Sequence, residues 1–91
     1  MLVLPPELTH KQASPCLRML VQGLPSQATK VVVDATALTH FDSSALAVLI
    51  EFRRASLARG KGFEIRGLAP RLVDLAGLYG VEELLVPQAQ A

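Results

Sequence analysis

Two hydroxyl groups directly follow a carboxylate in the segment Asp42-Ser43-Ser44. The apolar periodicity after this segment predicts a helix that begins near Ser43, and a helix start exposes unpaired N–H groups and a partial positive charge. Asp42 or Ser43 could therefore cap the helix in the ordinary way. A phosphate on Ser43 would also meet a favourable dipole and would add about −1.5 to −2 charges. The local sequence favours the cap and leaves phosphorylation as the alternative.

Other residues of catalytic type do not fall into a catalytic pattern. Ser43, His40 and either Asp34 or Asp42 supply the residue types of a hydrolase triad, but no G-x-S-x-G elbow surrounds the serine. His10 and His40 have no third ligand at the spacing of a zinc site. We therefore expect neither an enzyme nor a bound metal ion.

Two further features are weak signals for a cofactor or for redox chemistry. The segment Gly60-Lys61-Gly62 is not a P-loop, because the glycine spacing before it and the Ser or Thr after it are missing. Cys16 is the only cysteine, so it cannot form an internal disulfide, and we expect it to pack within a helix. No cofactor is predicted from these residues.

The elements that must hold these residues alternate between strand-like and helix-like segments. The β-branched run within residues 30–35 predicts an interior strand buried on both faces. Shorter strands are predicted at 2–4, 63–66 and 84–86, helices at 14–24, 43–59 and 70–79, and a loop at 36–42. This order predicts an α/β fold in which a sheet of roughly four mainly parallel strands packs with three helices.

The first two predicted helices each show an inner face. In the first, Thr9 and Ser14 are the two candidate N-caps, and Pro15 after Ser14 fits the first turn of the helix. In the second, Leu46, Leu49 and Leu57 fall on the face expected to pack against the sheet. The opposite line of the second helix is expected to face solvent or a partner, and it consists of Ala47, Glu51, Arg54 and Ala58.

Length and composition limit the classes of protein. The 91 residues predict one domain over 1–87, followed by a disordered tail at 88–91. Nine Lys and Arg against eight Asp and Glu give a net charge of +1, which argues against nucleic-acid binding. The longest apolar run, 45–50, is far shorter than the roughly 20 residues of a membrane span. With a single cysteine, the chain is expected to be cytoplasmic. A charged fraction of only 19% leaves apolar surface for a partner.

The segment 31–49 resembles the signature of the STAS domain, the family of anti-sigma-factor antagonists. Family members carry a strand, a loop, and then Asp-Ser-Ser-Gly-Leu or Asp-Thr-Gly-Gly-Leu at the start of a helix; here residues 42–46 read Asp-Ser-Ser-Ala-Leu. The resemblance continues through 60–65 and 75–80 and covers residues 30–87, with a fainter match over the first predicted strand and helix. It implies the STAS fold. Family members begin with one more strand than this sequence predicts, so we expect the sheet to lack their first edge strand.

Two branches of the family resemble this chain. In anti-sigma-factor antagonists, a partner kinase phosphorylates the Ser that follows the motif Asp, and Ser43 holds that position. In the small STAS subunit of the bacterial phospholipid (Mla) ABC transporter, a Thr holds the position, and the subunit docks on the ATPase at the cytoplasmic side. Residues 75–81 and 84–87 resemble the transporter branch more closely, whereas Ala45 replaces a Gly that is usual in both branches.

The resemblance therefore implies a non-enzymatic adaptor that binds a transporter ATPase or, as the alternative, an anti-sigma kinase. The expected partner surface consists of Asp42, Ser43, Ser44, Ala47 and Arg54, with Ser43 as the switch residue in the alternative. Any contact with the membrane would pass through the partner. Nucleotide binding by some STAS domains is a minor alternative to which no residues are assigned. A missing edge strand and few charges also predict self-association when no partner is present.

Overall fold

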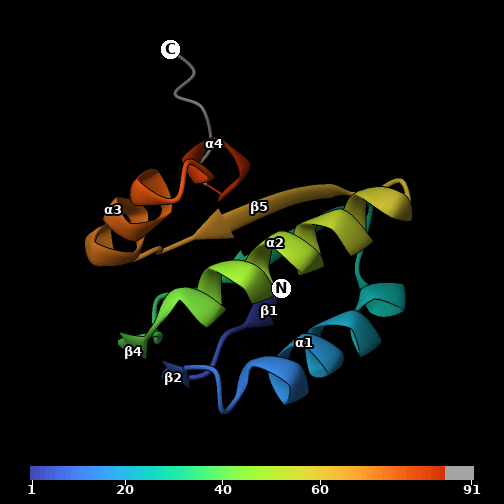
Figure 1. Ribbon diagram of the computed structural model, residues 1–91. Helices are drawn as coiled ribbons and strands as arrows, with labels where there is room; N and C mark the ends of the chain where they lie inside the picture. The colour runs from blue at the N-terminus through green and yellow to red at the C-terminus, as the bar shows by residue number, and fades with distance from the viewer. Residues whose placement is uncertain (86–91) are drawn as a thin grey trace.

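The computed structural model describes residues 1–85, which form two small parallel sheets and four α-helices (Figure 1). The strands are β1 (Leu2–Val3), β2 (Glu7–Leu8), β3 (Lys30–Asp34), β4 (His40–Phe41) and β5 (Gly62–Arg66). The helices are α1 (Ala13–Gln22), α2 (Ser43–Ala58), α3 (Pro70–Leu78) and α4 (Glu82–Leu85), with a short 3-10 helix at Leu24–Ser26. The predicted α/β fold is confirmed.

The main sheet has the order β1-β3-β5, with every pair parallel. Leu2 pairs with Val33 on one side of β3, and Lys30 pairs with Gly62 on the other. Strand β3 is therefore the interior strand, as predicted. Its burial on both faces is a prediction that is wrong: Val31 and Val33 are fully buried, but Val32 between them is only half-buried.

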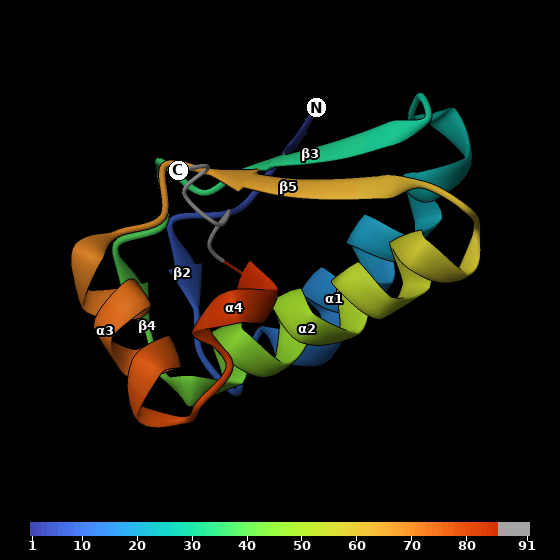
Figure 2. The ribbon, with the colours of Figure 1, turned by 90° about the horizontal axis from the view of Figure 1, so that it is seen from above.

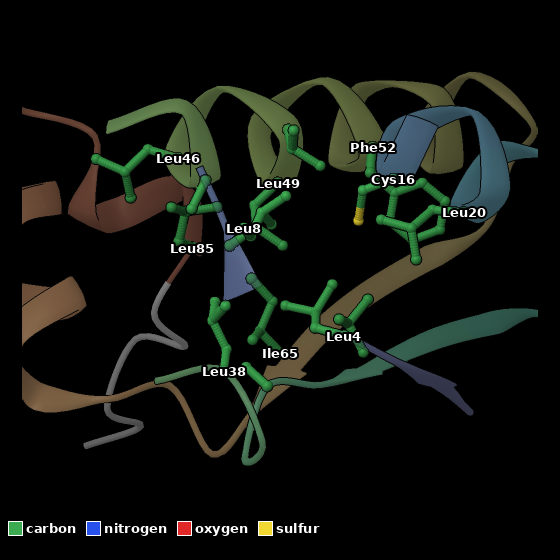
Figure 3. Close-up of a cluster of buried hydrophobic side chains, with 14 of the residues drawn as sticks. Leu4, Leu8, Cys16, Leu20, Leu38, Leu46, Leu49, Phe52, Ile65 and Leu85 are labelled. Atoms are coloured by element: carbon green, nitrogen blue, oxygen red, sulfur yellow. The ribbon is translucent and has the colours of Figure 1, made fainter. Parts of the chain in front are cut away.

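The reason is that the helices cover a single face of the sheet. Figure 2 shows β3 and β5 along one side of the molecule, with α1, α2, α3 and α4 on the other. The core lies between these layers, where Leu49 points from α2 toward Leu8 of β2 and Ile65 of β5 (Figure 3). Phe52 of α2 meets Phe63 of β5 edge to face, with ring centroids 5.9 Å apart.

A second sheet joins β2 to β4, and the sequence did not predict it, because residues 36–42 read as a loop. Glu7 pairs with His40 and Leu8 with Phe41, and the N–H groups of Thr39 and His40 both donate to the Pro6 carbonyl. Strands of two residues are too short to show a recognisable alternation of apolar and polar side chains. The pair matters because it fixes the chain just before α1 and α2.

The last predicted element was a strand at 84–86, and this prediction is wrong over the described residues 84 and 85. Residues 82–85 form α4, with Glu82 and Glu83 in the first turn, where carboxylates favour a helix. The described part of the chain therefore has three strands in the main sheet and four helices, instead of four strands and three helices. Residue 86 of that prediction, and the predicted tail at 88–91, lie outside the described residues.

Two details of the helices also differ from expectation. Helix α1 begins at Ala13, so Ser14 is not its cap; the N-cap is Gln12, whose side chain accepts hydrogen bonds from the N–H and the hydroxyl of Thr9, both at 2.8 Å. Pro15 lies in the first turn, where backbone N–H groups have no partner within the helix, so the lack of an N–H at Pro15 costs no hydrogen bond. Leu57 of α2, expected inside, is 45% exposed near the end of the helix.

Candidate partner-binding site

The first turn of α2 is held by Asp42. Its backbone is extended, and its Oδ1 accepts the Ser44 N–H at 2.8 Å, so the N-cap that the local sequence favoured is confirmed. The other oxygen, Oδ2, accepts the His10 N–H at 3.2 Å. The Ser44 N–H is the main cause that lowers the pKa of Asp42, and the His10 N–H adds to it. The carboxylate is therefore charged at neutral pH.

This carboxylate joins the starts of two neighbouring helices. Strands β2 and β4 pair in parallel and lead into α1 and α2, so both helices begin at the same end of the molecule (Figure 1). His10 lies in the turn before α1, and its Nδ1 is 3.6 Å from Asp42 Oδ2. Asp42 thus holds the α1 turn and the α2 turn in one arrangement, and that arrangement fixes the position of Ser43.

The remaining predicted site residues lie on or beside the outer line of α2. Ser43 is the first helical residue and is exposed; Ser44 is half-buried, and Ala47 and Arg54 are exposed. The expectation that this line of α2 faces outward is confirmed. Arg54 lies two turns beyond Ala47 and pairs with Glu51 at 3.2 Å, so it stands apart from the residues of the first turn.

The replacement of the family glycine by Ala45 does not obstruct this surface. The Ala45 side chain is fully buried and belongs to the core cluster, on the side of α2 away from Ala47. Its methyl group therefore packs inward. Near the start of α2 the exposed side chains are therefore small, a hydroxymethyl group at Ser43 and a methyl group at Ala47.

Beside this line runs an apolar groove of about 310 Å³, which we call the α2 groove. One wall is α2 and the other is the connection between α3 and α4; the lining residues are Ser43, Leu46, Ala47, Ile50, Tyr79 and Val81. Small side chains at the two outer positions of α2 leave the groove open. On the opposite wall Tyr79 is 60% exposed, and the preceding residue Leu78 is 83% exposed, which is unusual for large apolar side chains.

The wall opposite α2 was not among the predicted site residues. Gly80 takes a positive φ of 72° after α3, and the Val81 N–H then bonds to the Ala76 carbonyl at 3.0 Å. This reversal brings Tyr79 and Val81 beside α2. The sequence signal was a helix stop at Gly80, which gives the turn but not the element that the turn faces.

The residues of the rejected triad are not brought together. His40 Nε2 lies 3.8 Å from Glu7, and His10 faces Asp42. The Asp34 carboxylate ends β3 and accepts the Thr36 N–H at 2.9 Å, and hydrogen bonds from Thr36 lower its pKa. Within residues 1–85, no three His, Cys, Asp or Glu side chains are placed to hold a metal ion. Nor does any helix there have the length and apolar character needed to cross a membrane.

A comparison with known protein families shows to which family the chain belongs. A family model described as "Mlab, STAS domain" matches residues 1–87. The chain belongs to the STAS domain family. The match includes β1, β2 and α1, where the sequence resemblance was faint, and it confirms the predicted family and fold class. No curated protein matches the sequence significantly.

STAS domains are in general non-enzymatic domains that regulate or support other proteins by binding them. The start of α2 in this STAS domain combines an ordered cap, two small outer side chains and an adjacent apolar groove. This combination suits contact with another protein, because it offers apolar area without a bulky side chain in the way.

Proposed function

We propose that this STAS domain is a non-enzymatic adaptor that docks on the ATPase subunit of a phospholipid-trafficking, Mla-type ABC transporter. The partner surface consists of Asp42, Ser43, Ser44, Ala47 and Arg54. The observation that carries the proposal is the open α2 groove beside Ser43, in a chain whose matching family model carries the MlaB description.

The physical case rests on what an interface needs at its centre. Stable interfaces have a desolvated apolar core with a polar rim. In this chain the apolar wall of the groove supplies the core, and Asp42 and Arg54 lie on either side of the lining residues along the sequence of α2 as polar groups. Ser43 and Ala47 allow a helix of the partner to approach the backbone of α2 closely, since neither side chain extends far.

The adaptor would act in the cytoplasm, and it would reach the cytoplasmic face of the inner membrane only through the ATPase. The net charge of +1 supports neither a nucleic-acid surface nor a strong electrostatic attraction to anionic lipid.

A second candidate function rests on Ser43 itself. Its hydroxyl is exposed at the first position of a 16-residue helix, where a kinase could reach it and where the helix dipole tolerates a phosphate. In that case the chain would be an anti-sigma-factor antagonist. Phosphate on Ser43 would place a double charge next to the groove and would release the anti-sigma kinase.

The experiment that separates the two functions is reconstitution with purified partners from the same organism. The chain is mixed with the Mla-type ATPase subunit or with each small anti-sigma kinase, ATP is added, and complexes and phosphosites are measured by size-exclusion chromatography and mass spectrometry. We expect a stable complex with the ATPase and no change at Ser43. Stoichiometric phosphate on Ser43 together with release of a kinase would overturn the adaptor in favour of the switch.

A further inference from the structure

Strand β5 has a free edge. It pairs with β3 on one side, and no strand among residues 1–85 pairs with it on the other. The Gly62 N–H and the Arg66 carbonyl both bond to residues that flank β3. Because backbone groups alternate in direction along a strand, the N–H and carbonyl groups of Phe63 and Ile65 point away from β3. An unpaired edge of this kind accepts a further strand.

A groove of about 460 Å³ follows this edge, and we call it the β5 edge groove. Strand β5 forms one wall, and α4 and the end of α2 form the other; Figure 1 shows β5 and α4 together at the upper side of the molecule. The lining residues are Lys30, Arg53, Phe63, Glu64, Ile65, Glu83, Leu84 and Leu85. Two cations and two carboxylates balance there, so the groove does not select a strongly charged partner.

The side chains of Glu64 and Arg66 stand two residues apart on the face of the sheet that no helix covers. The Arg66 Nε–H donates to Glu64 Oε2 at 2.6 Å, and the other Glu64 oxygen pairs with Lys30. This bond uses one of the five N–H donors of the guanidinium, and each carboxylate oxygen accepts more than one hydrogen bond. Both groups can therefore gain a second partner without losing the first.

From the free edge and these charges we infer that a second copy of this chain occupies the β5 edge groove, with the two β5 strands antiparallel about Ile65. The two Ile65 residues exchange both of their backbone hydrogen bonds. Glu64 of each copy then lies opposite Arg66 of the other. The four charged side chains form a ring in which every neighbour has the opposite sign, and the Glu64–Arg66 bond within each copy is kept. The two sheets join into one continuous sheet.

The charges select both the register and the occupant. A pair centred on Glu64 would place two carboxylates opposite each other, at the shortest distance between antiparallel strands. A strand of another protein would need a carboxylate and a cation at the same spacing, whereas β5 supplies them itself. The inference does not depend on the proposed function, because the β5 edge groove and the α2 groove share no lining residue.

The first test identifies the dimer and its register. Sedimentation of the full chain over a wide range of concentrations is expected to show a monomer–dimer equilibrium. For the register, Cys16→Ala first removes the native thiol, and one chain then carries Glu64→Cys and the other Arg66→Cys. Residues beside a hydrogen-bonded antiparallel pair have the closest Cβ atoms, which suits a disulfide. We expect mild oxidation to link the mixed chains into a heterodimer and to leave each variant alone largely unlinked.

The second test exchanges the charges. Glu64→Arg and Arg66→Glu each place like charges opposite one another, so each variant alone should dimerise about tenfold more weakly or worse. Mixing the two variants restores opposite charges across the seam and should recover the wild-type affinity to within about threefold. Asp74→Arg makes the same change of charge on α3, outside the groove, and should leave dimerisation unchanged. Thermal unfolding checks that each variant is folded.

Several results would overturn the inference. A chain that stays monomeric at every concentration excludes the dimer. Oxidation that links Glu64→Cys to itself as readily as to Arg66→Cys excludes the register, and equal effects of Glu64→Arg and Asp74→Arg exclude the charged ring. A monomeric wild type that dimerises only after removal of residues 86–91 would assign the edge to those residues. A dimer dissolved by Ala47→Arg but not by Glu64→Arg would assign self-association to the α2 groove.

Discussion

The starts of α1 and α2 lie at the same end of the molecule, and both follow a strand of the β2–β4 pair. They differ in how they are capped. The Asp42 carboxylate accepts the N–H of Ser44, the second residue of its own helix, and the His10 N–H of the neighbouring turn. Gln12 instead bonds backward to Thr9 and makes no side-chain cap to α1.

The two starts also differ in their surroundings. Ser43 opens onto the apolar groove walled by Tyr79, whereas Ser14 is an exposed residue outside the pocket at its own end of α1. That pocket is also largely apolar, although Lys11 and Gln12 contribute to its lining. The comparison teaches that neither a serine at a helix start nor a nearby apolar pocket defines a site. The difference is that Ser43 itself lines its groove, and each prediction below changes one start and uses the other as its control.

The largest effect is expected for a new carboxylate at the start of α2, and the same change at the start of α1 is its control. The free chain tolerates Ser43→Asp, because the new carboxylate lies at a helix N-terminus. In the docked complex, however, this charge loses its water without gaining a compensating cation. An unpaired buried charge costs about 3–5 kcal/mol, which weakens ATPase binding by about two to four orders of magnitude. Ser14→Asp, in the first turn of α1, should change binding less than about threefold. Calorimetric titration of the ATPase measures both; equal losses would contradict a site at α2.

The next effect concerns the stability of the chain rather than its binding. Asp42→Ala removes the acceptor of the Ser44 and His10 N–H groups, so it loosens two turns at once. We expect it to lower the melting temperature by several degrees. Gln12→Ala loses only the bonds to Thr9 and should lower it by less. Circular dichroism melts rank the two, and a larger loss for Gln12→Ala would show that the α2 cap is not the stronger one.

The Asp42 carboxylate also predicts a dependence on pH. Its pKa is lowered in the folded chain by the Ser44 N–H, so the stability it provides is complete above the unfolded pKa and is lost as pH falls through the folded pKa. Glu64, whose pKa is lowered to about 2 chiefly by Arg66 and also by Lys30, contributes in the same acidic range. Asp42→Asn keeps a cap without the charge, and it should reduce the loss of stability between neutral and acidic pH in urea titrations. Gln12→Ala serves as the control, because it changes the other helix start without adding or removing a titrating group. A wild type and an Asp42→Asn variant with parallel pH profiles would refute this account.

The smallest effect is expected for removal of the hydroxyl. Ser43→Ala keeps a small side chain in the groove, so ATPase binding should weaken by less than about tenfold, which corresponds to about 1 kcal/mol for one hydrogen bond. Ser14→Ala should have no measurable effect. Complete loss of binding with Ser43→Ala would mean that the hydroxyl itself is essential to the contact.

Much of the fold could be predicted from the sequence because the signals were local. The run Val31-Val32-Val33 marked the interior strand, and Asp42 before an apolar periodicity marked the cap and the start of α2. The β2–β4 pair could not be predicted, because pairing of Glu7 with His40 is a contact between distant residues that two-residue strands do not encode. Whether β3 was covered on both faces depended on where all the helices pack, which no single segment determines.

The candidate site was predictable in part for the same reason. Periodicity along one helix was enough to place Ser43, Ala47 and Arg54 on the outer line of α2. The groove needed a second wall, and Tyr79 reaches it only through the reversal at Gly80. The short strand predicted at 84–86 failed because an apolar pair such as Leu84-Leu85 fits a strand or a helix turn equally, and the preceding Glu82 and Glu83 favour the helix.

The most direct test of docking at the α2 groove is hydrogen exchange of the full chain with and without the purified Mla-type ATPase. Amide protection is read by mass spectrometry over the whole sequence. The account predicts new protection at residues 43–50 and 78–81, with little change at 13–19 around the start of α1. Protection confined to α1 or to the uncovered face of the β1-β3-β5 sheet, with 43–50 exchanging as in the free chain, would contradict it.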